Sequence, residues 1–442
     1  MTALFDADTV ARLSHRTAEP AWLAARRQVA FERFSALPWP DQTLEEWKHT
    51  DIRKLDLERF DATPPVNEPV AELEDLPPEV RALAIGQKGD RLGLGVRMDA
   101  DLVHVRLAPK LADAGVILNR VEDVAREQPE LVERWLGRAG VSEFEAKIEA
   151  LNAAFTGGRS FLYVPRNVSV ELPIQMVRWI THEGVAIFPR TVIVADEGAS
   201  VTYIDYFSGA ALAGEALCVA AVEIYAEQGA TVNYLQVQDF PQSVWHFNVQ
   251  RALVGRDATV RSLAATLGGK FSRSVAQAVL EGQGAHGELL GVYFGDHDQH
   301  IDNRTLQLHR APHTSSELYY KGALKGSSQA IYSGLVDIEK DAKQSDAQQT
   351  NRNLLLSRGA SALPDPFLEI KTSEVVRATH AVSVGRPDEN VLFYLKSRGL
   401  DDEAAQNVFV KGFFQEVIDR VHVPEIRTSL EAAVEDELAL EE

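Results

Sequence analysis

The sequence predicts a mainly β fold, in which a right-handed parallel β-helix is flanked by N-terminal and C-terminal α-helical domains. Between about Gly157 and Ile370, short apolar runs alternate with turns of small residues. Four of these turns share a Gly-Ala or Asp-Ala step, and they begin at Gly198, Gly229, Asp257 and Gly284. The starts lie 31, 28 and 27 residues apart, a spacing that suits one coil of a solenoid and is too irregular for a helical repeat array.

The apolar runs themselves alternate in the manner of strands. In Thr231–Gln238, for example, Val232 and Tyr234 fall on one face. Many short strands with steady turns also suit a pair of β-sandwiches, which remains the alternative fold. The length of the unbroken array favours the β-helix, because a solenoid grows simply by adding coils.

Composition limits the classes of partner. The chain has 442 residues, with 65 acidic and 45 basic side chains and a formal charge of -20. Such a surface repels phosphate groups, so we expect neither nucleic acid nor an anionic membrane as a partner. No apolar run reaches the roughly 18 residues that span a bilayer, and the N-terminus lacks the apolar core of a signal peptide. A cytoplasmic location is therefore expected.

The regions on either side of the repeats are predicted to be helical. We expect an N-terminal helical domain with a linker over residues 1–156, the β-helix over 157–384, and a C-terminal helical domain over 385–442. In the last of these, Asp388 can cap a helix and Gly399 can end it. Two further helices carry apolar stripes, which either form the core of a small domain or leave a docking surface exposed.

The polar residues of the repeats offer only weak catalytic signals. The densest group contains His297, His300 and Asp302, which could in principle bind a transition metal. In a strand, however, residues 297 and 300 point to opposite faces, and polar turns are the simpler interpretation. Cys218, the only cysteine, lies in an apolar run and is predicted to be a buried, inert thiol.

A cytosolic β-helix carbohydrate-active enzyme, either a lyase or a hydrolase, is the alternative function from a different class. Such enzymes use paired carboxylates for acid and base catalysis. The candidates here are Asp296, Asp298, Asp302 and Asp337. Nothing in the sequence fixes the distances between them, so this alternative depends on the fold alone.

A series of short motifs runs along nearly the whole chain. It starts with Glu45-Glu46-Trp47-Lys48, and its most specific part lies in the second half of the chain. That part comprises Gly334, Ala342, Gln348 to Asn351, Leu354 to Ser357, Pro364 to Ile370, His380, Phe393 to Leu395 and Ser397 to Gly399. Before it come Leu162 to Pro165, Pro173 to Gln175, His309 to Pro312 with Ser315, and Tyr320 to Gly322. In this ordered set the chain resembles the SufB/SufD family, the β-helical scaffold subunits of the Suf iron–sulfur cluster assembly machine.

Within that family the chain resembles SufD rather than SufB. Family members commonly carry a cysteine two residues before the histidine that matches His380, and in SufB a cysteine of this region is thought to receive sulfur. Here that position is Ala378. His380 itself matches the histidine implicated in SufD. The resemblance implies that it faces a SufB cysteine across the subunit interface as a candidate iron ligand.

The resemblance also implies the partners. It points to a non-enzymatic scaffold, with no catalytic residue, that pairs with SufB through the β-helix. The resemblance implies that a transient iron–sulfur cluster forms at the interface. The helices over 388–421 would dock SufC, the ATPase of the SufBCD complex, and the isolated chain could instead form a homodimer. Reduced FAD is associated with complexes of this family, but no residue of this sequence is assigned to it.

Overall fold

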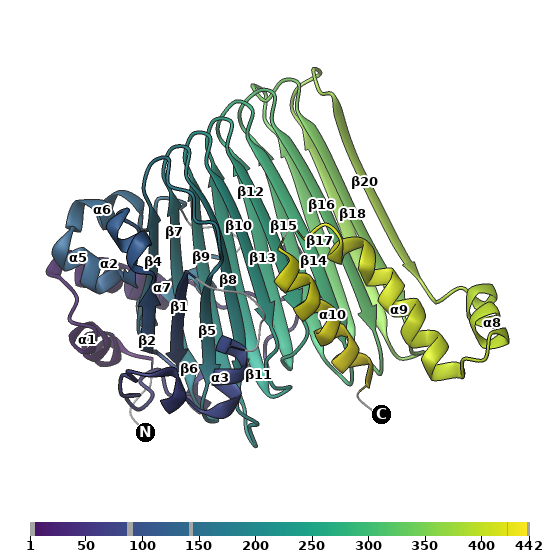
Figure 1. The fold of residues 1–442 in the computed structure, drawn as a ribbon, viewed down its shortest axis with the longest axis horizontal. Helices are drawn as coiled ribbons and strands as arrows, with labels where there is room; N and C mark the ends of the chain where they lie inside the picture. Colours follow the sequence, from purple (N-terminus) through teal and green to yellow (C-terminus); the bar gives the residue numbers. More distant parts are fainter. Residues whose placement is uncertain (1–4, 86–91, 141–144, 422, 440–442) are drawn as a thin grey trace.

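The alternating runs form two long sheets that face each other across a shared core, as Figure 1 shows. The structure is a computed structural model that describes residues 5–85, 92–140, 145–421 and 423–439. From β4 and β5 onward the strands within each sheet are parallel. The chain passes from one sheet to the other and back in each coil, so the predicted β-helix core with flanking helices is confirmed. A sandwich pair, the alternative, would be built mainly from antiparallel strands.

The first sheet contains ten strands. In spatial order they are β2 (Asp101–Leu107), β1 (Gly93–Met98), β5 (Ile174–Ile180), β8 (Ser200–Gly209), β10 (Thr231–Gln238), β12 (Thr259–Thr266), β14 (His286–Gly295), β16 (Ser315–Leu324), β18 (Asp346–Leu355) and β20 (Arg377–Gly385).

The strands of the second sheet are given from the last coil back to the first. They are β19 (Ser361–Ile370), β17 (Gln329–Ile338), β15 (His300–His309), β13 (Phe271–Leu280), β11 (Val244–Val254), β9 (Ala216–Ala226), β7 (Arg190–Ala195), β4 (Arg159–Val164) and β3 (Ile117–Arg120), and the short β6 (Ala186–Ile187) pairs with β9.

The register of the strands reproduces the sequence repeat. In the first sheet Ser200 pairs with Thr231, and Thr231 pairs with Thr259. Thr259 in turn pairs with His286. Successive strands therefore advance by 31, 28 and 27 residues, as the spacing of the small-residue turns predicts.

A left-handed corner residue explains why those turns contain glycine. Gly198, Gly229 and Gly284 have φ of +69°, +67° and +75°, which glycine adopts without the penalty that a Cβ brings. Asp257 takes the same conformation with φ +52°. The corner recurs at three positions outside the four Gly-Ala and Asp-Ala turns, Asn167, His313 and Gln344. The repeat cannot be recognised in the sequence at those coils, because the corner residue is not the glycine or aspartate of the other turns.

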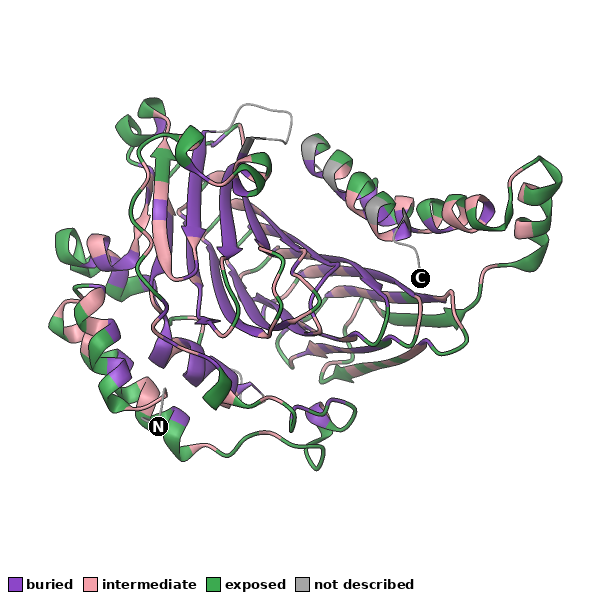
Figure 2. Cartoon of the chain, turned by 90° about the horizontal axis from the view of Figure 1, so that it is seen from below, coloured by how far each residue is buried: buried purple, intermediate pink, exposed green. Residues whose placement is uncertain are grey.

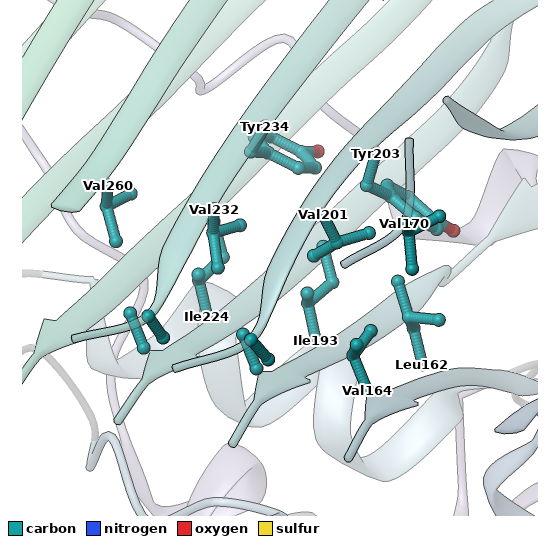
Figure 3. Packing of buried hydrophobic residues seen from close by; sticks show 14 of the residues in the cluster. Leu162, Val164, Val170, Ile193, Val201, Tyr203, Ile224, Val232, Tyr234 and Val260 are labelled. Carbon is teal, nitrogen blue, oxygen red and sulfur yellow. The ribbon is translucent and has the colours of Figure 1, made fainter. Parts of the chain in front are cut away.

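Equivalent apolar side chains stack from coil to coil between the sheets (Figure 3). Val201, Val232 and Val260 occupy one register position in three successive strands, and all three are buried. Tyr203 and Tyr234 stack in the same way, with ring centroids 6.3 Å apart. Each fully buried side chain of this size contributes about 1.5–3 kcal/mol, so the ladders hold consecutive coils together.

The N-terminal region covers the first coils. It contributes α1 (Ala7–Arg16), α2 (Ala21–Ala36), α3 (Pro78–Ile85), α4 (Pro109–Asp113), α5 (Val121–Glu127), α6 (Pro129–Trp135), α7 (Ala146–Phe155) and three short 3-10 helices, η1 (Glu45–Trp47), η2 (Leu57–Arg59) and η3 (Leu73–Asp75). It also contributes β1, β2 and β3, which the sequence analysis did not predict. β2 pairs antiparallel with β1 at the start of the first sheet, and β3 pairs antiparallel with β4 at the start of the second. These two strands end the parallel array there.

The C-terminal helices are α8 (Glu389–Ser397), α9 (Asp402–Ile418) and α10 (Pro424–Ala439). Asp388 caps α8 by accepting a hydrogen bond from the Asn390 backbone N–H, 2.8 Å away, and Gly399 follows with φ +96°. Both predicted roles are confirmed. The apolar stripes of α9 and α10 pack on the outer face of the first sheet, in one cluster with its side chains. α8 stands away from the solenoid beyond β20 (Figure 1). Among the described helices, none is long and apolar enough to cross a bilayer.

Candidate functional site

The last coil of the solenoid, formed by β19 and β20, lies open. Each of these strands has a neighbour on one side only, β17 for β19 and β18 for β20. In Figure 2 the central strands are buried, whereas the strands of the last coil are intermediate or exposed. Six large apolar side chains of this coil are 41 to 62% exposed: Leu363, Phe367, Ile370, Val376, Val382 and Val384. Exposed edge strands of this kind are ready to pair with another chain.

His380 lies on the inward face of β20. The register places Ala378 opposite Ala347 and His380 opposite Gln349, and both of these β18 residues are buried. Because side chains alternate along a strand, Ala378, His380 and Val382 share the face that continues the solenoid interior. The predicted site residue therefore lies at the exposed mouth of the core.

The core beneath His380 is polar. Gln349 donates from Nε2 to the Tyr332 hydroxyl at 2.9 Å and to the Gly334 carbonyl at 3.1 Å. Asn351, two residues along β18, donates to the Tyr293 hydroxyl at 3.0 Å. The Gln349 side-chain oxygen is buried and has no hydrogen-bond partner in the described part of the chain. The mouth thus combines an imidazole with amide and hydroxyl groups.

His380 has no hydrogen bond or ion pair with the other described residues, and its side chain is exposed. An imidazole in its neutral form is a competent ligand for iron. One such residue cannot hold a metal by itself. The described residues contain no group of three or more His, Cys, Asp or Glu side chains that could bind a metal ion. Further ligands would have to come from outside this part of the chain.

The histidine-rich group around residue 300 is structural. His300 and Asp302 share one face, as predicted, but Asp302 is buried in ion pairs with Arg273 and Arg304. The pKa of His300 is lowered, chiefly by burial, and its ring stacks on Phe271 with centroids 5.3 Å apart. His297 lies on an exposed corner with φ +49°. These residues form turns and ion pairs, which agrees with the simpler interpretation.

Two of the carboxylates considered for a carbohydrate enzyme, Asp302 and Asp337, lie far apart. Asp302 and Asp337 lie on the neighbouring strands β15 and β17, where Asp337 pairs in register with Leu308. Leu308 is six residues beyond Asp302 on β15, so the two acids are separated by about 20 Å along the strand direction. Asp337 also accepts a salt bridge from Lys371 at 2.9 Å. Paired carboxylates of glycosidases lie within about 5–10 Å of each other.

Cys218 is buried, as predicted. It lies on β9 among apolar side chains, and burial raises the pKa of its thiol far above the ordinary value. A thiol that stays protonated is a poor nucleophile and a poor metal ligand. Sulfur chemistry at this cysteine is therefore not supported.

The sequence analysis overlooked the residues that make the open end apolar. Val382 and Val384 follow His380 on the same inward face of β20, and both are exposed. The signal was present in the sequence: alternation over residues 378–384 ends at Gly385, and no further coil follows. Inward side chains of β20 are exposed because no further coil of the described structure packs on them.

Comparisons with known proteins identify the family. A family model described as the SufBD core domain of the SUF system for FeS cluster assembly matches residues 178–413, and a model of the SufBD protein N-terminal region matches residues 99–176. The iron-sulfur cluster assembly protein SufD of Bacillus subtilis (strain 168) is 32% identical over 434 residues, covering 97% of each chain.

Two further relatives are similar over most of their length. An iron-sulfur cluster assembly SufBD family protein of Mycobacterium leprae (strain TN) is 34% identical over 338 residues, covering 74% of this chain and 84% of the relative. One of Staphylococcus saprophyticus is 28% identical over 413 residues, covering 92% and 87%. The chain therefore belongs to the SufBD family of the SUF system for iron–sulfur cluster assembly, in which it is SufD-like.

Proposed function

We propose that this chain is a non-enzymatic scaffold subunit that pairs with SufB through the open end of its solenoid. A nascent iron–sulfur cluster forms at that interface, and His380 provides one iron ligand. The C-terminal helices dock the SufC ATPase. The observation that carries the proposal is the last coil, which brings an unpaired imidazole and a row of exposed apolar side chains to a free sheet edge.

β20 is the better of the two free edges for pairing. β19 contains Pro364 and Pro366, which have no N–H to donate and are tolerated on edge strands. β20 contains no proline, so every backbone N–H group that points away from β18 can donate to a partner strand. A partner strand added to β20 would satisfy them and cover Val382 and Val384. We infer that SufB adds to the first sheet at this edge.

The chemistry of His380 suits a site shared between two subunits. The resemblance places a SufB cysteine opposite it, and thiolate and imidazole together are common ligands of iron. This chain has Ala378 at the inward position where many relatives carry their own cysteine, and Ala378 packs against the core of the preceding coil. The proposal therefore assigns the sulfur ligand to the partner and the nitrogen ligand to this chain.

α8 is the least buried helix of the described C-terminal region and is our candidate for docking an ATPase. Phe393 is 72% and Tyr394 is 55% exposed, and none of the α8 residues is buried. Within the predicted contact over 388–421 we favour α8, because the apolar stripe of α9 already packs on the first sheet. Movement of SufC would act on α8, which is joined to β20 by the short segment 386–388.

The remaining parts of the proposal follow from the same features. We place the chain in the cytoplasm, where the Suf machine works. The free β20 edge also allows a homodimer when SufB is absent. Reduced FAD, which the resemblance attaches to the complex, has no assigned residue in this chain, and the proposal uses no step that depends on it.

Pairing is tested by Val382→Asp in a co-expression with SufB and SufC. A carboxylate at this exposed inward position would be buried without a partner in the interface, at a cost of several kcal/mol. We expect recovery of SufB with the variant to fall at least tenfold. Val29→Asp is the matched control, since Val29 is also exposed but lies on α2 in the N-terminal region. Normal recovery of SufB with Val382→Asp would contradict pairing at this edge.

A further inference from the structure

A groove of about 650 Å³ lies on the outer face of the second sheet, whereas His380 lies on the inward face of the first sheet. Its floor is made of outward-facing aliphatic and aromatic side chains of β13, β15, β17 and β19, namely Val275, Leu306, Leu308, Ile331, Leu335 and Phe367. The N-terminal residues Glu45, Glu46 and His49 form one wall. No role described so far uses this groove.

Buried contacts of Trp47 with Arg273 and of Thr50 with Asp302, which we call the clip, fix this wall on the second sheet. Trp47 is fully buried, and the guanidinium of Arg273 lies 3.7 Å above its ring centroid. Arg273 donates to the Glu46 backbone carbonyl at 3.2 Å. Thr50 donates to the buried Asp302 carboxylate at 2.6 Å. The conspicuous Glu-Glu-Trp-Lys motif thus fixes its two glutamates at the edge of the groove.

The arginines that line the groove are already paired with carboxylates. Arg304 lies 3.0 Å from Asp302, and Arg310 lies 2.9 Å from Glu281. Arg138 pairs with Glu227 at 3.0 Å and Arg251 with Glu149 at 3.6 Å. These cations are therefore not available to bind an anionic ligand without breaking an existing ion pair.

Two acids of the lining have no such partner. Glu46, on the N-terminal wall, and Asp365, on β19, have no basic side chain within ion-pair distance among the described residues. Both line the same groove, and both keep access to solvent. The uncompensated charge around the apolar floor is therefore negative, which favours a cationic occupant.

The chain itself shows how an outer sheet face is covered. On the first sheet, α9 packs Phe414 against the strands, and Glu416 of the helix accepts a salt bridge from Lys321 of β16 at 2.7 Å. Arg420 pairs in the opposite sense with Glu317 of β16. An amphipathic helix with charges complementary to the sheet thus covers one face. The groove on the outer face of the second sheet likewise combines an apolar floor with charged groups, but its unpaired groups in the described part of the chain are the acids Glu46 and Asp365.

We propose that this groove, which we call the second-sheet groove, binds an amphipathic helix of a partner protein through an apolar face flanked by lysine or arginine. Phe367 is 44% exposed and sits on the outermost strand, so the groove is continuous with the open end of the solenoid. A helix in the groove would extend a subunit interface from the edge of the last coil onto the outer face.

A pair of synthetic helical peptides tests the proposal on the purified full-length chain. The probe is a fluorescein-labelled 16-residue peptide with leucines on one face and lysines beside them. Its control has the same leucines and glutamates in place of the lysines. Fluorescence anisotropy should show at least tenfold tighter binding of the lysine peptide. Phe367→Lys should weaken that binding at least tenfold, and Leu335→Lys should do the same.

Matched variants separate the groove from the general negative charge of the protein. Glu46→Lys combined with Asp365→Lys should weaken lysine-peptide binding about tenfold. Glu171→Lys combined with Glu68→Lys makes the same change of charge at exposed sites outside the groove and should leave binding within twofold. Thermal unfolding shows whether each variant is folded. If Leu335→Lys does not fold, Phe367→Lys still tests the apolar floor of the groove. Equal binding of the two peptides, or equal losses in the groove and control variants, would overturn the proposal. Binding of anilinonaphthalene sulfonate to the groove without peptide binding would also overturn it, in favour of a small-molecule site.

Discussion

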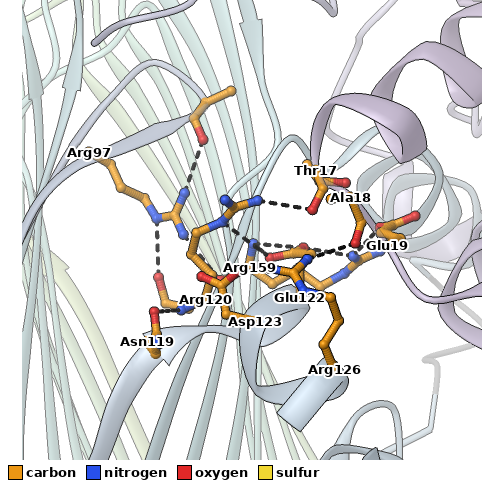
Figure 4. A network of polar contacts seen from close by, with 12 residues as sticks. Thr17, Ala18, Glu19, Arg97, Asn119, Arg120, Glu122, Asp123, Arg126 and Arg159 are labelled. Atoms are coloured by element: carbon orange, nitrogen blue, oxygen red, sulfur yellow. Dashed lines mark hydrogen bonds and ion pairs between the residues drawn. The ribbon is translucent and has the colours of Figure 1, made fainter. Parts of the chain in front are cut away.

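At the level of single residues, buried charges fix how the N-terminal region sits on the first coils. Glu19 pairs with Arg27 and with Arg159, and Arg159 also pairs with Glu122 at 2.9 Å (Figure 4). Arg97 joins the network by donating to the Arg159 carbonyl at 3.1 Å. Burial by itself would raise the pKa of Glu19, but the two arginines outweigh it and lower the pKa to about 2.

This shift predicts an acid-dependent contribution to stability. Because the folded pKa of Glu19 lies below its ordinary value of 4.5, the stabilisation is present above pH 4.5 and is lost as the pH falls toward 2. Glu19→Gln leaves buried guanidinium groups short of a carboxylate and should lower the free energy of unfolding by about 3 kcal/mol at pH 7. Urea unfolding at pH 7 and pH 3 measures the difference, which should shrink at the lower pH. Glu171→Gln, at an exposed site, is the control, and an equal effect there would contradict the assignment.

At the level of elements, the left-handed corners set the coil. Gly229 has φ +67°, and a Cβ added there would meet nothing within 4 Å, so only the backbone conformation opposes a side chain. Gly229→Val should therefore lower the free energy of unfolding by about 1–2 kcal/mol, with Gly229→Asn costing less. Gly412, inside α9 and also in open space, is the matched control, because Gly412→Ala should stabilise by about 0.5–1 kcal/mol. Urea unfolding would contradict the corner account if Gly229→Val proved neutral.

The separate position of α8 makes a second prediction at this scale. Phe393 contributes nothing to the core, so Phe393→Asp should leave thermal unfolding of the isolated chain unchanged. If α8 docks SufC, the same substitution should weaken SufC binding at least tenfold, as measured by titration calorimetry. Val29→Asp provides a control with an equal change of charge. Unaltered SufC binding by Phe393→Asp would move the docking surface away from α8.

At the level of the whole molecule, the two ends of the solenoid differ. Helices and the antiparallel strands β2 and β3 cover the first coil, whereas the last coil ends in β19 and β20 with apolar side chains exposed. A parallel array can grow at any uncovered edge, so a protein that caps one end and leaves the other open has one direction for assembly. The SufD-like sequence and the open end thus support the same role.

The repeat could be predicted from sequence because glycine and aspartate mark four of its corners. The remaining corners, at Asn167, His313 and Gln344, carry no such mark, and only backbone geometry reveals them. The strands β1 to β3 were missed because they lie outside the repeat. The groove could not be predicted either, since the clip joins Trp47 to Arg273 across more than two hundred residues of sequence.

His380 was found through the family motif rather than through local chemistry. A single histidine in a strand gives no sign of function, and only the position of that strand at the end of the array shows that the imidazole is exposed. Its role as an iron ligand stays a prediction until a cluster is measured on the assembled complex.

The most direct test of His380 as an iron ligand is the iron and sulfide content of the SufBCD complex, purified without oxygen. The wild-type complex is compared with complexes that carry a substitution of His380. We expect the His380→Ala complex to assemble normally but to lose most of the bound iron and sulfide. His380→Cys should retain more of both than His380→Ala, because a thiolate can replace the imidazole as a ligand. An assembled His380→Ala complex with the full content of iron and sulfide would contradict the account, because the open end would then serve pairing alone.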